Sequence, residues 1–207
     1  MRIIQAIAAG ILMAAGLSQA RAAESKPVYK WVAANEYYMI MPAGQSLDIS
    51  GGGSESVKPW GFGFRAVGNN ETISKTGGLQ FQSIKVDNPH TGKDTFYLFD
   101  LLLGMEFMTP KAQGKPLRFT ASAFADLGLS DTTLYAAPLL SAGLLYTTDE
   151  YADTPKGFTF DIFYRPIDID LDNVGGGRAG TLKPALGFKI GYIFEGFWTT
   201  KEKSKAD

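Results

Sequence analysis

The stretch that decides the fold lies near the C-terminus and reads LGFKIGYIF at residues 186–194, with an apolar side chain at every second position. Side chains of a β-strand alternate between its two faces. This stretch therefore has one aliphatic and aromatic face, and an opposite face that includes Gly187, Lys189 and Gly191. Trp60–Ala66 and Phe158–Arg165 alternate in the same way, with small or charged residues opposite the apolar ones. The pattern predicts long amphipathic strands.

Segments of this kind recur along the chain, separated by turns rich in glycine, asparagine and proline. We expect about eight strands, at Tyr29–Met41, Pro59–Gly68, Gly78–Asp87, Thr95–Thr109, Leu117–Leu129, Leu134–Thr148, Phe158–Leu171 and Leu182–Trp198. Long amphipathic strands expose unpaired edges unless their sheet closes. The sequence therefore predicts an all-β fold, an antiparallel up-and-down barrel over residues 23–207, with a charged tail at 199–207. The interior of so narrow a barrel is nearly filled by its side chains.

One segment also allows a helical interpretation, because residues 132–148 carry no charge. Read as a helix, this segment would be a candidate membrane span. Pro138 in its middle, together with Gly143 and the threonines, lowers helix propensity. We expect a strand here.

The N-terminus has the order of a secretory signal peptide. A basic start at Arg2 is followed by an uncharged run over 3–17 and then by Ala20-x-Ala22, which fits a cleavage site after Ala22. The run is shorter than the roughly 18–20 residues of a membrane-spanning helix. We therefore expect residues 1–22 to be removed on export.

Composition excludes several classes of function. Removal of residues 1–22 takes two of the 20 basic residues and none of the 21 acidic ones, so the mature chain has no excess of positive charge. No basic stripe for nucleic acid is present. Because the chain has no cysteine, disulfides and thiolate chemistry are also excluded. The sequence predicts no cofactor, and we expect a monomer.

Charge placement indicates the medium. Charged residues lie inside predicted strands, among them Arg65, Asp100, Glu106, Asp126, Asp161, Arg165 and Lys189. Four of them share a face with glycine or threonine, opposite the aromatic residues, and we predict that they form a charge network in the barrel lumen: Arg65, Asp161, Arg165 and Lys189. In that arrangement the apolar face points outward to lipid, the outer-membrane lipid being the expected partner. Aromatic residues at strand ends are candidates for interfacial girdles, namely Trp31, Tyr37, Tyr38, Trp60, Tyr146, Tyr151, Phe197 and Trp198.

In these features residues 29–198 resemble the small outer-membrane β-barrels of Gram-negative bacteria, the OmpA-transmembrane, OmpX and OmpW-like class. The resemblance implies a location in the cell outer membrane and a structural, surface or minor permeation role without enzymatic activity. One alternative is a soluble, lipocalin-like periplasmic barrel that binds an apolar ligand. Another is a membrane-embedded lipid-modifying enzyme, for which His90, the only histidine, is the candidate catalytic residue.

Two further motifs are candidate sites. Asp168, Asp170 and Asp172 recur at every second residue and are candidates for binding a hard cation such as Ca²⁺; a solvated strand end is the simpler interpretation. The pattern Gly175-x-Gly177-x-x-Gly180 matches a dinucleotide fingerprint, which requires a helix after it. Because an alternating strand follows, we expect a hairpin loop instead.

Overall fold

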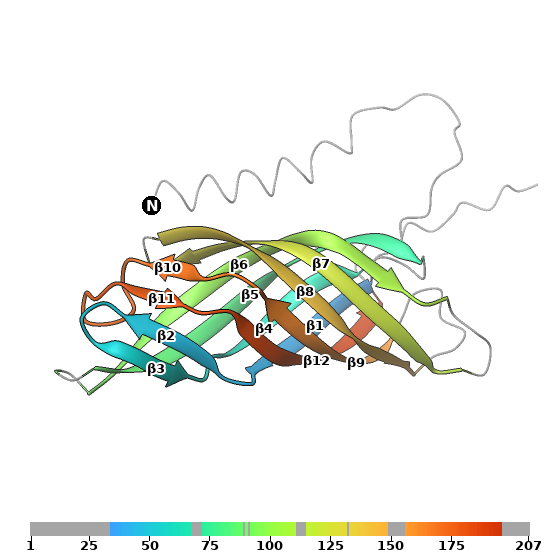
Figure 1. Cartoon of the computed structure of the whole chain (residues 1–207). Helices are drawn as coiled ribbons and strands as arrows, with labels where there is room; N and C mark the ends of the chain where they lie inside the picture. The colour runs from blue at the N-terminus through green and yellow to red at the C-terminus, as the bar shows by residue number, and fades with distance from the viewer. Residues whose placement is uncertain are drawn as a thin grey trace, which may run out of the picture. The chain divides into compact units, whose positions relative to one another are not determined.

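The computed structural model describes residues 34–67, 72–88, 90, 92–110, 115–131, 133–148 and 156–195. All of the regular structure in these residues is β-strand, in two sheets (Figure 1). The strands are β1 (Ala34–Pro42), β2 (Gln45–Ile49), β3 (Gly53–Val57), β4 (Trp60–Val67), β5 (Ile73–Asn88), β6 (Gly92–Met108), β7 (Leu117–Ser130), β8 (Thr133–Thr147), β9 (Gly157–Arg165), β10 (Ile169–Leu171), β11 (Gly180–Leu182) and β12 (Ala185–Glu195).

Eight of the strands form a closed antiparallel barrel in the order β1-β12-β9-β8-β7-β6-β5-β4. β1 closes the ring because it pairs with β12 on one edge and with β4 on the other, so that Tyr38 lies opposite both Gly191 and Gly63. The predicted all-β barrel of about eight strands is confirmed. Within the segment 132–148, residues Thr133–Thr147 form strand β8 rather than a helix. Among the described residues, no helix is long and apolar enough to cross a membrane.

Four short strands form a second sheet in the order β10-β11-β2-β3, gathered at one end of the barrel (Figure 1). Each short strand is next along the chain to one barrel strand: β10 to β9, β11 to β12, β2 to β1 and β3 to β4. The short strands therefore have the same order as the barrel strands β9-β12-β1-β4. Two backbone hydrogen bonds maintain the pairing at the junctions, from Ala43 N–H to the Leu186 carbonyl and from Lys183 N–H to the Ser46 carbonyl. The small sheet is thus a broken extension of half of the barrel wall.

A proline lies in or directly before each of the four breaks in the wall. Pro59, Pro166 and Pro184 lie between strands, and Pro42 is the last residue of β1. Proline has no N–H for the sheet ladder, and it restricts the backbone of the residue before it. The predicted strand Phe158–Leu171 is therefore divided into β9 and β10. The predicted strand Leu182–Trp198 starts at the last residue of β11, Leu182, and its main part is β12. The prediction also missed β2 and β3.

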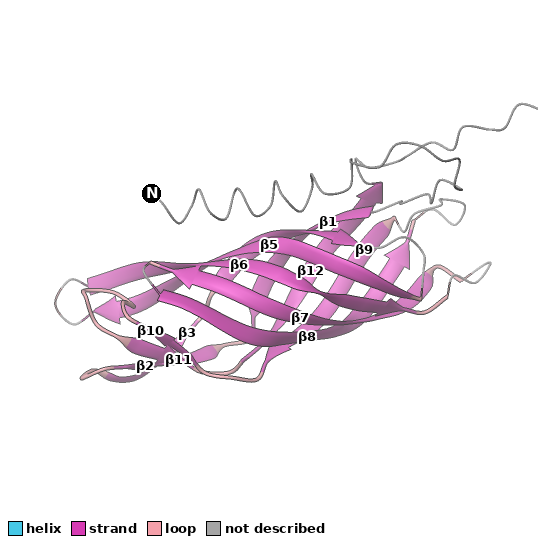
Figure 2. Cartoon of the chain, turned by 90° about the horizontal axis from the view of Figure 1, so that it is seen from above, coloured by secondary structure: helices cyan, strands magenta, loops and turns pink. Residues whose placement is uncertain are grey.

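The other half of the wall, β5 to β8, consists of the longest strands, which extend alongside the small sheet (Figure 2). A buried apolar cluster fills the space between them; it comprises Leu47, Ile49, Val57, Ile84, Val86, Phe96, Leu98, Ala137, Ile169, Leu171, Val174 and Leu182. A second apolar cluster lies at the opposite end of the barrel, where β1 begins and β12 ends. It comprises Ala34, Val67, Met108, Leu145 and Ile193. Both ends of the barrel interior are therefore packed with apolar side chains.

Candidate functional site

The barrel has the reverse polarity of a soluble protein. Phe62 and Phe160 on its outer face are 55% and 45% exposed, whereas Arg65 and Asp161 on the inner face of the same strands are each 2% exposed. The small and charged faces therefore point inward and the apolar faces outward. Water-soluble barrels place these faces the other way round, since burial of apolar surface is what stabilises them.

The outward side chains form an apolar belt, which is clearest on β6. Every outward residue from Tyr97 to Phe107 is aromatic or aliphatic. At about 3.3 Å per residue this row is about 33 Å long, and a tilt of about 40° reduces its height to about 25 Å. This is the height of the apolar band of a membrane-spanning barrel. Aromatic rings contact one another across neighbouring strands of the belt, for example Phe62 with Phe81 and Phe81 with Phe99.

Three of the predicted girdle residues, Tyr37, Trp60 and Tyr146, are 56%, 52% and 52% exposed on this outer surface. The assignment of Tyr38 to a girdle is wrong. It is 3% exposed and points inward, because the alternation along β1 places it on the same face as Ile40. The remaining candidates lie outside the described residues, as do the predicted signal peptide and the charged tail; they are Trp31, Tyr151, Phe197 and Trp198.

The interior contains two ionic groups, and the first is a layer around Arg65. Its guanidinium donates a hydrogen bond to Glu36 and lies 3.3 Å from a Glu106 oxygen and 3.7 Å from an Asp161 oxygen. Hydroxyl groups complete the layer: Thr159 donates to Glu36, and Thr120 donates to Asp161 at 3.1 Å. One buried cation thus neutralises part of the charge of three buried carboxylates from three other strands.

Lys189 lies among aromatic rings. Its ammonium nitrogen is 5.1 Å from the ring centroid of Tyr38, 5.5 Å from that of Phe163 and 5.6 Å from that of Phe124. Within the described part of the chain, this nitrogen has no hydrogen-bond partner. Cation–π attraction is stronger in a dry site than in water, so the three rings offset part of the cost of burying this charge.

A second ionic group lies nearer to the small sheet. Asp100 accepts hydrogen bonds from the Tyr135 hydroxyl and from the amides of Gln80 and Gln82, at 2.9 Å and 3.0 Å for the amides. Arg165 lies 3.7 Å from Asp126. The structure therefore brings Arg65 together with Asp161 and places Arg165 and Lys189 elsewhere in the same interior.

Glycines make room for these side chains. A Cβ at Gly143 would lie 2.2 Å from an Asp161 oxygen, and a Cβ at Gly78 would lie 2.6 Å from the Arg65 Cβ. Gly143 faces Asp161 and Gly78 faces Arg65 in the strand register. The alternation of apolar residues with glycine that reveals the strands thus also reflects the space that the interior charges need.

Sequence reasoning missed two partners in the interior. Asn35 and Glu36 are adjacent in β1 and both are buried, so the alternation of buried and exposed residues is interrupted at this point. The predicted set of inward charges did not include Glu36. Tyr135 lies in an apolar segment in which nothing marks it as the donor to Asp100. For Glu36, the inward parity that it shares with Ile40 was an available signal.

The candidate cation ligands do not converge. Asp168 accepts a hydrogen bond from the Lys183 ammonium at 2.9 Å, and Asp170 accepts one from Thr181 at 2.7 Å. The backbone N–H of Asp172 donates to Thr133 instead. In the described ranges, no group of three or more histidine or acidic side chains is placed to hold a metal ion.

The other two motifs lie in loops. His90 is exposed between β5 and β6, and its backbone N–H donates to the Asn88 side chain at 2.9 Å. Gly175 and Gly177 of the glycine motif lie in the loop between β10 and β11, and Gly180 is the first residue of β11. There the Asn173 side chain accepts hydrogen bonds from the N–H groups of Gly175 and Gly177, and a strand rather than a helix follows.

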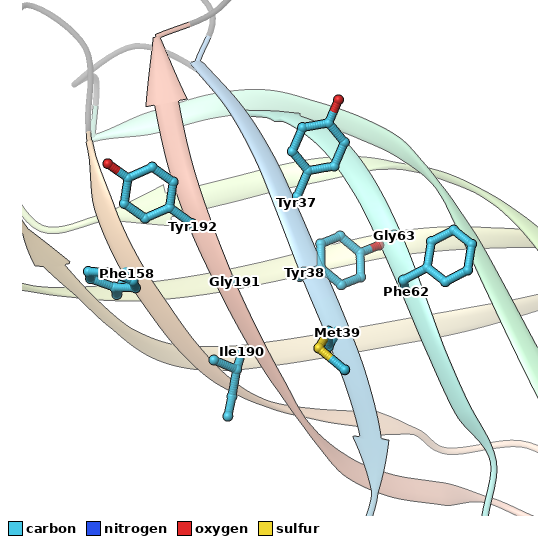
Figure 3. Close-up of a pocket in the computed structure, with 9 residues that line it drawn as sticks. All are labelled: Tyr37, Tyr38, Met39, Phe62, Gly63, Phe158, Ile190, Gly191 and Tyr192. Carbon is cyan, nitrogen blue, oxygen red and sulfur yellow. The ribbon is translucent and has the colours of Figure 1, made fainter.

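A shallow hollow of about 380 Å³ lies on the outer surface of the barrel over β9, β12, β1 and β4 (Figure 3). Its walls are outward side chains of the apolar belt, namely Tyr37, Met39, Phe62, Phe158, Ile190 and Tyr192. Gly63 and Gly191 form its floor, on either side of Tyr38. The hollow is part of the apolar surface and contains no charged side chain.

No protein-family model matches the sequence, and no curated protein matches it. The similar solved structures include two outer-membrane proteins. The outer membrane protein OprG from Pseudomonas aeruginosa is 12% identical, with a TM-score of 0.47 and coverage of 81% of this chain and 96% of that one. Ail, the attachment invasion locus protein of Yersinia pestis, is 18% identical, with a TM-score of 0.38 and coverage of 78% and 99%. The strand pairing and side-chain exposure of this chain themselves give it the architecture of a small membrane-spanning β-barrel.

Proposed function

We propose that this chain spans the outer membrane as a closed barrel without an open pore, and that it displays the small sheet at the cell surface. The observation that carries the proposal is the reversed polarity: Phe62 and Phe160 are exposed on the same strands on which Arg65 and Asp161 are buried. An apolar surface that encircles a protein is stable only in contact with lipid or another apolar partner. This polarity argues against the soluble lipocalin-like alternative, which needs the aromatic rows inside.

The connections between strands support the orientation. Both described ends of the barrel chain, Ala34 and Glu195, lie at one end, since they are paired in the register of β1 and β12. The longest connections lie at the other end and carry the small sheet, over residues 43–59 and 166–184. Membrane barrels of bacteria have short periplasmic turns and longer extracellular loops. We therefore assign the small sheet to the outside.

A structural or surface role fits this interior better than permeation. The ionic layers lie between two apolar clusters, one at each end of the barrel. Eight-stranded barrels are just wide enough to be filled by their own side chains. In planar bilayers, we expect the purified protein to produce no steady single-channel conductance.

Fractionation tests the location. We expect the protein in the detergent-extracted outer-membrane fraction, with gel migration that changes on heating, as is typical of a folded barrel. Release by osmotic shock without detergent would contradict the proposal and support a soluble periplasmic protein. For the lipid-modifying alternative, a His90→Ala variant tests the candidate residue; we expect the lipid A mass spectrum of the host to be unchanged.

A further inference from the structure

The apolar belt ends sharply over β4, β5 and β6. Trp60, Ser83 and Tyr97 lie side by side in the strand register, and they form the last row of the belt on these strands. The next outward residues toward the small sheet are Lys58, Lys85 and Thr95, all exposed. Two lysines therefore lie directly beyond a row with an aromatic residue at each end, at the level where the headgroups of a lipid leaflet begin.

The two lysines lie beyond the same register pair. Trp60 faces Ser83 across β4 and β5, and Lys58 and Lys85 each lie two residues farther toward the small sheet, Lys58 just before the start of β4. Two like charges at neighbouring positions repel each other. Neither lysine belongs to any of the ion pairs found between described residues.

The nearest acidic residues lie farther from the belt. Asp87 is two residues beyond Lys85 and faces Lys93 across β5 and β6. Glu55 accepts a hydrogen bond from the Asp87 backbone N–H at 3.1 Å. Among the described residues, neither Lys58 nor Lys85 therefore has an acidic side chain within ion-pair distance.

The described residues at the same end of β7 and β8 contain no such pair of lysines. Over β7 and β8 the belt reaches the hairpin itself, where Leu129 faces Leu134 and Leu134 is 65% exposed. The residue that follows in the turn is acidic, Asp131. The basic charge at this boundary is therefore local to β4 and β5.

We propose that Lys58 and Lys85 bind the phosphate group of an outer-leaflet lipid whose acyl chains pack on the aromatic surface below them. Phosphate is the anionic group found at the headgroup level, and the lysines lie next to Trp60, an interfacial residue type. Phe62, Phe81 and Phe99 form the contiguous apolar surface on the membrane side of this row. The inference rests on the proposed membrane location.

Binding of lipid A tests the proposal, with the detergent-solubilised full barrel and native mass spectrometry as the readout. We expect each substitution, Lys58→Gln or Lys85→Gln, to weaken the affinity for diphosphorylated lipid A about fivefold, and the double variant to weaken it about 25-fold. Lys75→Gln is the matched control, because Lys75 is exposed on β5, the strand that contains Lys85, and lies near the other end of the belt. Heat-modifiable migration verifies that each variant is folded.

Two further arms define the ligand. Dephosphorylated lipid A should bind the wild type and the double variant equally, and millimolar inorganic phosphate should not displace lipid A. An unchanged affinity of the double variant, an equal loss in Lys75→Gln, or full displacement by inorganic phosphate would overturn the inference. Wild-type protein absent from the outer-membrane fraction would refute the proposed location; wild-type protein present there, with an unchanged double variant, would refute only the lipid site.

Discussion

The ion pair between Arg65 and Asp161 crosses the barrel interior: the guanidinium on β4 lies 3.7 Å from the carboxylate on β9. These strands are not neighbours in the barrel order, so the contact joins separate parts of the wall. Both residues are nearly inaccessible to solvent. The interior charges are therefore structural elements of a filled barrel, and their loss should be measurable as instability.

Arg65→Met should destabilise the barrel strongly. The substitution removes the cation that Glu36, Glu106 and Asp161 share and leaves their charges uncompensated. Removing one partner of a buried ion pair costs about 3–5 kcal/mol. Urea unfolding of the protein in vesicles, followed by heat-modifiable migration, measures the free energy of unfolding. Lys75→Met is the control, because Lys75 is exposed; equal stability of the two variants would contradict the role of Arg65.

Gly143→Val tests the space that the interior charges need. The Cβ of any larger residue would lie 2.2 Å both from an Asp161 oxygen and from the Phe160 carbonyl oxygen. Crowding of a packed interior typically costs about 1–3 kcal/mol, and backbone contact places this site at the upper end. Ala142→Val is the control, since Ala142 is exposed on the outer face. The same urea midpoint for the two variants would be evidence against the close approach.

Leu103→Arg tests the medium around the belt. Leu103 is 50% exposed on β6, midway between Tyr97 and Phe107. An arginine at the centre of the lipid face of a barrel costs about 2–4 kcal/mol, and the cost falls to about 0–1 kcal/mol near the interface. Thr95→Arg, beyond the belt on the same face, should therefore be nearly neutral. A neutral Leu103→Arg variant in vesicles would show that water surrounds this row.

The small sheet should respond to pH at both extremes. Lys183 lies between Asp168 and Asp48, at 2.9 Å and 3.0 Å, and these hydrogen bonds raise the pKa of Lys183 above its usual 10.5. Hydrogen bonds from Ser54 and Lys183 lower the pKa of Asp48 below its usual 3.8. A raised lysine pKa stabilises the fold at pH below 10.5 and ceases to do so as pH rises through the folded value. A lowered aspartate pKa stabilises it above 3.8 and ceases to do so as pH falls through the folded value.

Hydrogen-exchange protection of β2 and β11 should consequently be constant between about pH 5 and 10 and decline outside this window. In Lys183→Met both declines should weaken, because the substitution removes the titrating ammonium and one of the two hydrogen bonds to Asp48. Protection that declines in the same way in the variant and the wild type would exclude this cluster as the cause.

The barrel strands were predictable because a barrel wall in lipid enforces strict alternation, as in LGFKIGYIF at 186–194. The small sheet was not, because β10 and β11 have three residues each and β3 is a polar segment that begins with glycine. Alternation also predicted which charges face inward. It did not identify partners such as Arg65 and Glu106, which depend on strand order and register around the ring. Tyr38 shows the same limit: its residue type is typical of an interface, and only its parity along β1 places it inside.

The orientation of the two faces can be measured directly along β12, because a chain without cysteine accepts single cysteines for spin labelling. In lipid vesicles, labels at 186, 188, 190, 192 and 194 should be accessible to oxygen dissolved in the bilayer. Labels at 187, 189, 191 and 193 should be protected. The opposite alternation, or accessibility of the first set to a water-soluble relaxation reagent, would contradict a barrel whose aromatic rows face lipid.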